Sequence, residues 1–452
     1  MSNRPSLSPR DLAPTVARLR RANRRFLASY PGESVHPQPV HTFYGGAHLF
    51  RADTAARLGA LALAALDEYA PDAATFASAL GLGDIAATVR ERVVARLRSQ
   101  PVEDYRIDFE DGYGYRPDAE EDGHAESAAL EVARGIEGSM LPSGIGLRIK
   151  PMSNEAHARS LRTLDLFVTT LARQRRSRLP ERFFVTIPKV TMPEHVSAVA
   201  TVCRALERKL RLRAGAIRLE IMIETPQSVV AADGSIALGQ LVAAGGGRVT
   251  SAHFGTYDYT ALSGITAAWQ HMRHPVCDTA RHLMQAALAQ NGVRISDGGT
   301  NIMPVPIHRV EGQPLTARQQ KENRDAVHRA WKVHFDDITH SLISGFYQGW
   351  DLHPAQLPSR YAAVYAFYLS ALDAATRRLR AFVDKAAQAT LVGDVFDDAA
   401  TGQGLLNFFV RGIDAGALTI DEAARTGLTH DELTGRSFVA IVDARARAER
   451  RG

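Results

Sequence analysis

Short strand-like runs alternate with amphipathic helical segments through the middle of the chain, and this alternation constrains the fold more than any other feature. Strands that alternate with helices favour a parallel sheet. Eight such runs in one series favour a closed (β/α)8 TIM barrel, and no run leads into the GxGxxG motif of an open dinucleotide-binding sheet. The predicted strands cover residues 39–44, 105–109, 145–150, 183–190, 217–224, 248–255, 292–296 and 346–353.

The segments on either side of this series are helical in pattern. Residues 1–38 are expected to form an N-terminal helical arm, with its helix at 9–28. Residues 39–358 hold the predicted barrel, whose first connection, 45–104, contains two helical patterns. Residues 359–452 are expected to form a helical C-terminal extension, with helices at 360–387, 405–417 and 437–450 and a mobile Gly- and Asp-rich loop at 392–404.

Composition is ordinary for a soluble globular protein, with 45% hydrophobic and 23% charged residues. The formal charge of +5 is spread along the chain, and the densest basic run, 18–25, is more typical of a solvated helix face than of a nucleic-acid site. Cys203 and Cys277 have no disulfide or metal-type spacing. The N-terminus lacks a signal core, and the longest apolar run, 58–66, is too short to span a bilayer. We therefore expect a cytoplasmic protein with no nucleic-acid or membrane partner.

Two predicted strands end abruptly in an acid. The run LEIMIETPQSV, 219–229, is apolar until Glu224, and VTSAHFGTYDYTALSG, 249–264, leads to Asp258. A carboxylate at the end of an apolar strand is unfavourable in a core, but it suits a strand whose carboxyl end opens onto a site. In a barrel these ends converge on one mouth, where the chemistry takes place.

The other predicted strand ends are also polar. Carboxylates without cysteine or paired histidine favour a hard cation, Mg²⁺ or Mn²⁺, which takes one or two protein carboxylates and leaves its other positions to water and substrate. Arg148 offers a fork for a substrate carboxylate or phosphate. Together these groups suit a keto or hydroxy acid with a metal-stabilised enolate. The polar groups are Asp108, Glu110, Asp111, Arg148, Lys150, Lys189, Asp297, Asp351 and His353.

Each of these assignments has a simpler alternative. Glu224 could cap the following helix or pair with Arg148, and Asp258 could be a turn residue. The acids of IDFED, 107–111, could be salt-bridge partners of neighbouring cations. Lys189 could be a Schiff-base lysine, although such a site does not need the paired acids. A barrel without catalysis, with a binding or regulatory role, is a further alternative.

Several motifs resemble those of the citrate lyase beta-subunit family, which belongs to the pyruvate/phosphoenolpyruvate barrel superfamily and includes malyl-CoA lyases and 2-keto-acid aldolases. They cover residues 39–358 in the family's order, and GFYQGWDLHPAQL, 345–357, is the most specific. The other motifs are IDFED at 107–111, LRIKP at 147–151, TIPKV at 186–190, LEIMIET at 219–225 and FGTYDYTALSG at 254–264.

The resemblance implies a set of roles. Glu224 and Asp258 would bind Mg²⁺, and Arg148 would contact the substrate carboxylate or keto oxygen. Glu110 and Asp111 would lie near the water shell of the metal. The expected catalytic residues are thus Arg148, Asp108, Glu110 and Asp111, and the expected substrate-binding residues are Arg148, Lys189, Gly255, Thr256 and Tyr257.

The sequence departs from the family pattern at two predicted strands. The first strand reads HTFYGGAHLF, 41–50, and in the third strand Lys150 replaces the usual asparagine.

The leading expectation is a Mg²⁺-dependent carbon–carbon lyase or aldolase acting on a small keto or hydroxy acid or its CoA thioester, although nothing in the sequence specifies coenzyme A. The DFED motif, together with a helical C-terminal extension, also resembles malate synthase. The alternative to a lyase is therefore an enzyme that catalyses a Claisen condensation of acyl-CoA with glyoxylate. Asp108 and Asp397 are the candidate bases, and relatives are commonly homo-oligomers.

Overall fold

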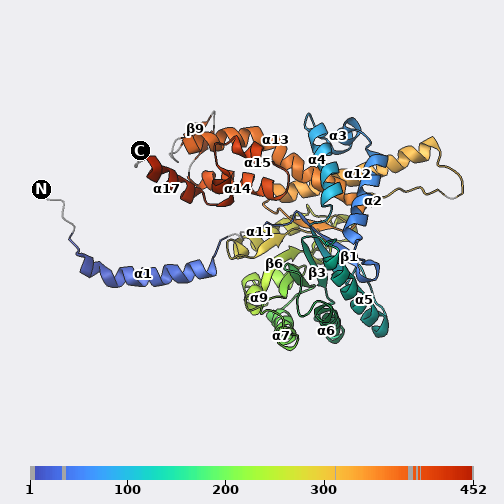
Figure 1. Cartoon of the computed structure of the whole chain (residues 1–452), viewed down its shortest axis with the longest axis horizontal. Helices are drawn as coiled ribbons and strands as arrows, with labels where there is room; N and C mark the ends of the chain where they lie inside the picture. Colours follow the sequence, from blue (N-terminus) through green and yellow to red (C-terminus); the bar gives the residue numbers. More distant parts are fainter. Residues whose placement is uncertain are drawn as a thin grey trace.

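Eight parallel strands form one sheet in the computed structural model, which describes residues 6–32, 37–310, 312–384, 390–392, 395–397 and 399–449 (Figure 1). The hydrogen-bonded order is β7-β6-β5-β4-β3-β2-β1-β8. Between β7 and β8 the ring is closed by the N–H of Asp297, which donates to Gln348 O at 2.8 Å, and that of Trp350, which donates to Gly298 O at 3.0 Å. The predicted (β/α)8 TIM barrel with helical extensions is therefore confirmed.

β1 and β2 keep the predicted length, whereas the other six strands are shorter than the predicted runs, because the sequence pattern continues into the polar ends. Pro188 illustrates the cause: it has no N–H to donate to the ladder, so β4 ends one residue before it. The strands are β1 His41–Gly46, β2 Asp104–Asp108, β3 Gly144–Arg148, β4 Phe183–Ile187, β5 Arg218–Ile223, β6 Val249–Phe254, β7 Arg294–Ser296 and β8 Gly349–Asp351.

The first connection holds three helices rather than the predicted two. Pro71 and Asp72 interrupt the pattern, and the Asp72 side chain accepts from the N–H of Thr75 to start a new helix. The three are α2 Thr54–Tyr69, α3 Ala73–Leu80 and α4 Ala86–Ser99. The later connections contain α5 Asp118–Glu137, α6 His157–Gln174, α7 Pro193–Lys209, α8 Pro226–Val229, α9 Leu238–Ala244, α10 Thr256–Leu262, α11 Pro275–Leu288 and α12 Ala317–Ile343.

The C-terminal extension packs against one side of the barrel through α13, Leu357–Asp384 (Figure 1). It then contains α14 Ala399–Asp414, α15 Ile420–Ala424, α16 His430–Thr434 and α17 Phe438–Glu449. A short antiparallel pair, β9 Thr390–Val392 and β10 Val395–Asp397, corrects the prediction of helices alone. The predicted loop 392–404 lies partly outside the described residues, as does the side chain of Asp397. The division into three domains stays a prediction.

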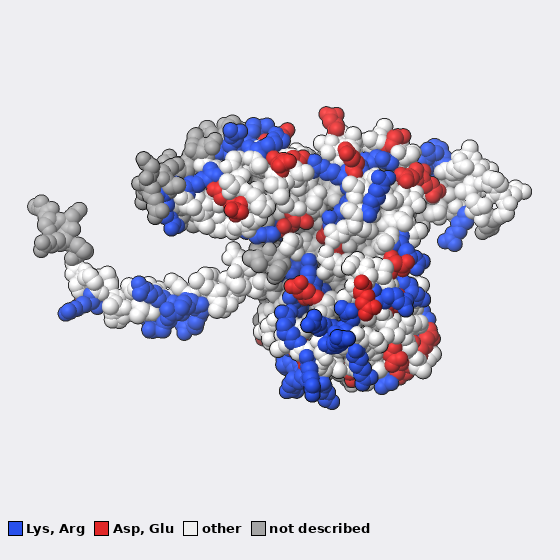
Figure 2. Space-filling view, viewed as in Figure 1, with Lys and Arg blue, Asp and Glu red and all other residues white. Residues whose placement is uncertain are grey.

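The N-terminal helix α1, Pro9–Ser29, extends away from the rest of the molecule (Figure 1). Ser8 and Asp11 form a capping box at its start, and every residue of the helix is exposed. Arginine side chains gather along it (Figure 2). After α1 the chain contacts the barrel at Gly32, whose N–H donates to Gln290 O at 2.9 Å.

The barrel axis contains a buried ionic layer. Arg106 of β2 is fully buried and donates to Asp104 Oδ1 at 2.6 Å and to Glu220 Oε1 at 2.9 Å. Glu220 also accepts from Thr186 of β4 at 2.7 Å and lies 3.4 Å from His253 of β6. Since buried charges are costly unless they are paired, each member of this layer depends on the others.

Asp297 and Asp351 face the outer helices rather than the mouth, which corrects the sequence-based placement. Asp351 Oδ1 lies 3.1 Å from His334 Nε2 of α12 and 3.0 Å from an Arg360 nitrogen of α13. Asp297 pairs with Arg281 of α11 at 2.8 Å. Successive strand residues point to opposite faces, and Trp350, the neighbour of Asp351, lines the mouth. These two acids fasten helices to the barrel.

Stability is expected to fall at mildly acidic pH because of His334. Burial lowers the pKa of His334 although Asp351 opposes this shift. The unfolded chain therefore takes up a proton below about pH 6.5 that the folded chain excludes, and the free energy of unfolding decreases by at most about 1.4 kcal/mol per pH unit. Urea unfolding between pH 7 and 5 should show a weaker decline in His334→Gln. Exposed His271→Gln is the control, and an unchanged slope in His334→Gln would contradict the assignment.

Candidate active site

A cavity of about 720 Å³ opens at the carboxyl ends of the strands. It is lined by eight of the ten residues that the sequence predicted for the site. The other two contact lining residues: Glu110 lies 3.2 Å from Arg148, and Lys189 lies 3.2 Å from Asp258. The eight lining residues are Asp108, Asp111, Arg148, Glu224, Gly255, Thr256, Tyr257 and Asp258. A second cavity of about 700 Å³, between β7 and α14, contains none of the ten.

Glu224 is buried immediately after β5, and its Oε1 accepts the backbone N–H of Lys189 at 2.6 Å. Burial raises the pKa of Glu224 to about 8, because the nearby Lys189 charge offsets the desolvation only in part. Lys189 has φ +48°, a left-handed backbone that is unusual for a lysine. Gly255 leaves the room that the Glu224 carboxylate needs: a Cβ at position 255 would lie 2.4 Å from Glu224 Oε2.

The ammonium of Lys189 joins the acids of different strands. It contacts Glu110 and lies 3.2 Å from both Asp111 Oδ2 and Asp258 Oδ2. Burial alone would lower the pKa of Lys189, but the charges of Glu224 and Glu110 outweigh it and raise the pKa. Schiff-base chemistry requires a neutral amine, so this environment disfavours the alternative role of Lys189.

Arg148 is fixed by Asp108 in a two-pronged ion pair. Its Nε donates to Asp108 Oδ1 at 2.7 Å, and a second nitrogen donates to Oδ2 at 2.5 Å. Asp108 also accepts the N–H groups of Glu110 at 2.9 Å and Gly112 at 2.8 Å. Both oxygens of Asp108 are thus engaged, which suits a residue that positions Arg148 and the following loop. The remaining Arg148 nitrogen lies 3.2 Å from Glu110.

Lys150 does not reach the mouth, contrary to the sequence-based placement. Its Nζ donates to Phe109 O at 2.7 Å and Gly114 O at 3.2 Å, and it lies 3.3 Å from buried Glu121 of α5. It therefore ties the loop that carries Glu110 and Asp111 to the surrounding helices.

The donor set of the mouth fits a hard divalent cation. Five carboxylates and two cations meet here, a formal excess of three negative charges, and the acids offer only oxygen atoms. Within the described parts of the chain, no three Asp, Glu, His or Cys side chains are grouped closely enough to hold an ion by themselves. Two carboxylates with water and substrate would complete the shell, as Mg²⁺ prefers. Glu224 and Asp258 are the pair that the sequence indicated.

Two polar atoms of the cavity lining have no hydrogen-bond partner among the described residues: Thr256 Oγ1 and Trp350 Nε1. Thr256 is 1% exposed, so an unpaired hydroxyl there favours a bound ligand as its partner. Tyr257, by contrast, accepts the N–H of Asn301 at 2.8 Å. Sequence reasoning missed Trp350, although its place inside the GFYQGWDLHPAQL motif was an available signal.

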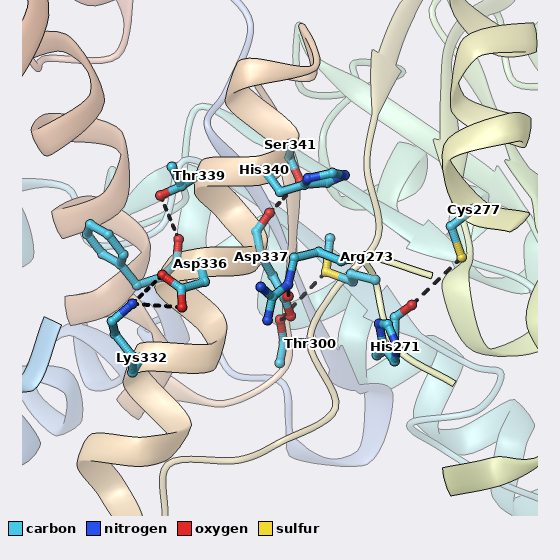
Figure 3. A network of polar contacts seen from close by, with 12 residues as sticks. His271, Arg273, Cys277, Thr300, Lys332, Asp336, Asp337, Thr339, His340 and Ser341 are labelled. Atoms are coloured by element: carbon cyan, nitrogen blue, oxygen red, sulfur yellow. Dashed lines mark hydrogen bonds and ion pairs between the residues drawn. The ribbon is translucent and has the colours of Figure 1, made fainter. Parts of the chain in front are cut away.

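A polar network outside the cavity holds the loop after β7 (Figure 3). Buried Asp337 of α12 accepts from Thr300 Oγ1 at 2.7 Å and from Arg273 Nε at 2.9 Å. The carbonyl of Thr300 accepts from Gln356 Nε2 at 2.9 Å. Gly299, which lines the cavity, is thereby fixed relative to the segment after α10.

Comparisons with known proteins identify the family. The family model described as a domain of unknown function, DUF6986, matches residues 19–441. The chain belongs to the DUF6986 family. No curated protein matches this DUF6986 member. None of its described helices is long and apolar enough to cross a membrane.

Three solved structures are similar to this DUF6986 protein. A citrate lyase from Burkholderia xenovorans LB400 is similar over 87% of this chain and 97% of that chain, with 17% identity and a TM-score of 0.55. The Haloferax volcanii malate synthase magnesium/glyoxylate complex is similar over 89% of this chain and 96% of that chain, with 14% identity and a TM-score of 0.46. Mycobacterium tuberculosis protein CitE, in complex with magnesium, acetoacetate and coenzyme A, is similar over 85% of this chain and 100% of that chain, with 14% identity and a TM-score of 0.46. The citrate lyase likeness confirms the predicted resemblance in fold.

Gly255→Ala is expected to disturb the Glu224 carboxylate. The new methyl group would sit 2.4 Å from Glu224 Cβ and Oε2, so the side chain must move. We expect a loss of about 1–3 kcal/mol in the free energy of unfolding, and Mg²⁺ affinity roughly 10-fold weaker by calorimetry. Gly239→Ala in α9 is the control, since nothing lies within 4 Å of its Cβ position. Unchanged Mg²⁺ affinity in Gly255→Ala would contradict this account.

Proposed function

We propose that this DUF6986 protein is a Mg²⁺-dependent carbon–carbon lyase of the aldolase type that acts on a 2-oxo or 2-hydroxy acid. The observation that carries the proposal is the mouth itself: buried Glu224 and nearby Asp258 lie in an all-oxygen acid cluster with an excess of negative charge, beside the fixed guanidinium of Arg148. The fold that the chain shares with the citrate lyase supports it.

Cleavage of a 4-hydroxy-2-oxo acid would proceed as a retro-aldol reaction. A base removes the hydroxyl proton, the C3–C4 bond breaks, and its electron pair moves toward the C2 keto oxygen as an aldehyde leaves. C3 of the resulting enolate then takes up a proton. Mg²⁺, when bound by Glu224 and Asp258, supplies Lewis-acid stabilisation of the charge that develops on the keto oxygen.

The residues of the chain divide the remaining work. Arg148 neutralises developing negative charge, and Asp108 keeps its guanidinium in place. Asp111 lines the cavity and has a side chain that is 61% exposed, so we assign it as the base in place of Asp108. Thr256 lines the cavity and is a candidate donor to the substrate, because its Oγ1 has no partner among the described residues. Lys189 balances part of the negative charge of Glu110, Asp111 and Asp258.

A panel of 2-oxo acids, aldehydes and CoA thioesters, each with Mg²⁺ or EDTA and read by product mass, tests this function. We expect Mg²⁺-dependent conversion of a 2-oxo acid and an aldehyde into their aldol adduct, or the reverse. Condensation of acetyl-CoA with glyoxylate would instead indicate a Claisen enzyme. EDTA-resistant turnover with borohydride inactivation would assign a Schiff base to Lys189, and no Mg²⁺ binding would favour a non-catalytic barrel. Homo-oligomeric assembly and a cytoplasmic location stay predictions.

A further inference from the structure

One wall of the mouth is apolar, and it lies opposite Glu224, which follows β5. The acids follow β2, β5 and β6, whereas the apolar wall comes from β8, β1 and α2. The order of the sheet places β1 four strands from β5 in a ring of eight, which is directly across the barrel. The Glu224 side of the cavity therefore faces the apolar wall, while the acids after β2 adjoin it. The apolar lining residues are Phe43, Leu49, Leu58, Leu61, Trp350, Leu352 and Pro354.

Helix α2 presents one face to the core and a second row of residues to the cavity. Its buried residues are Gly59, Ala62, Leu66 and Tyr69. The residues that line the cavity are Thr54, Arg57, Leu58 and Leu61, which recur at the spacing of a second helix face. Leu61 is 56% exposed, and Leu49, at the end of the preceding turn, is 66% exposed. Exposed leucines gathered in a cavity indicate a binding surface.

The cavity is also larger than the ionic site needs. Its volume of about 720 Å³ lies in the range that holds drug-sized ligands, and a three-carbon acid would leave most of it to water. An apolar group on the substrate would displace that water from the leucines and from Trp350.

Charge argues against a nucleotide-linked thioester as the source of that group. Coenzyme A carries several phosphate charges, which require cations at the binding surface. Of the lysines and arginines that line the cavity, Arg148 is engaged by Asp108, and Arg57 is the other. The lining therefore offers few cations to a group that carries several phosphate charges.

We infer that the substrate is a 2-oxo or 2-hydroxy acid with a bulky apolar substituent, aryl or alkyl, which lies against Leu58, Leu61 and Trp350. This inference rests on the proposed function, because it places the acid group on the Glu224 side of the cavity. The exposed face of α2 then has a role: it selects the substituent.

Equilibrium binding of unreactive 2-oxo acids tests the inference without turnover. Calorimetry with Mg²⁺ present would compare pyruvate, 2-oxobutanoate, 2-oxohexanoate, phenylpyruvate and acetyl-CoA. We expect the affinity to rise about fourfold for each added methylene, and phenylpyruvate to bind more than about 30-fold more tightly than pyruvate. In Leu61→Asp, the ratio of phenylpyruvate to pyruvate affinity should fall toward one. Leu130→Asp, at an exposed leucine of α5 outside the cavity, should keep the wild-type ratio.

The outcomes separate the two proposals. Equal affinity for all the free acids, or tighter binding of acetyl-CoA than of any of them, would overturn the apolar-substituent inference alone. A wild-type ratio in Leu61→Asp, with an unchanged circular dichroism spectrum, would also overturn it. Absence of Mg²⁺-dependent binding for pyruvate as well as for the longer acids would instead overturn the proposed function.

Discussion

Arg106→Met is expected to lower the free energy of unfolding by about 3–5 kcal/mol. Arg106 is fully buried in the barrel axis, where Asp104 and Glu220 depend on it for charge compensation. Methionine has a similar length but no charge, so two carboxylates would remain in a region from which water is excluded. Chemical denaturation followed by circular dichroism measures the change.

The matched control is Arg134→Met in α5. Arg134 also pairs with an acid, Glu131, at 2.6 Å, but its side chain is 67% exposed, and such pairs contribute about 0–1 kcal/mol. A similar, small loss in both variants would show that the ionic layer is not required for stability. Arg106→Met combined with Asp104→Asn and Glu220→Gln should recover part of the loss, because no unpaired charge would remain.

Glu224→Gln is expected to weaken Mg²⁺ binding about 100-fold or more and to reduce turnover at least as much. The amide oxygen can still accept the Lys189 N–H, so the local backbone should be preserved. Folding stability should not decrease, because the change removes a buried ionisable group whose pKa burial has already raised to about 8. Calorimetric titration with MgCl₂ alone gives the affinity independently of activity.

Glu181→Gln serves as the control, because Glu181 is exposed in the segment before β4. It should bind Mg²⁺ as the wild type does. If Glu224→Gln retained wild-type Mg²⁺ affinity, the metal would have to lie elsewhere, and Asp258→Asn would then be expected to have no effect either.

Periodicity predicted the barrel well, because strand and helix patterns are local. All eight strands lie within a few residues of the predicted runs. The ionic layer was missed for the opposite reason. Arg106 and Glu220 each stand between two apolar residues of a strand, which signals a buried charge, but their pairing depends on the register of β2 through β5. That register is set by closure of the barrel.

The candidate site could be predicted only in part. Glu224, Asp258 and Arg148 were recognisable as polar residues at strand ends, and the structure places them around one cavity. Asp297 and Asp351 had the same signal but point to the helices, because facing changes with each residue along a strand. The apolar wall of α2 was not predictable, since Leu58 and Leu61 fall in a run that also supplies core residues.

At Lys189, the stability of the backbone and the needs of the site conflict. Its left-handed backbone is strained by about 1–2 kcal/mol for any residue with a Cβ, and glycine would relieve that strain. Glycine would also remove the ammonium that contacts Glu110, Asp111 and Asp258. Laboratory evolution for heat resistance alone could therefore favour loss of this lysine, and such variants would have to be screened for ligand binding as well. At position 189, the residue that would give the most stable backbone is therefore not the residue that the site needs.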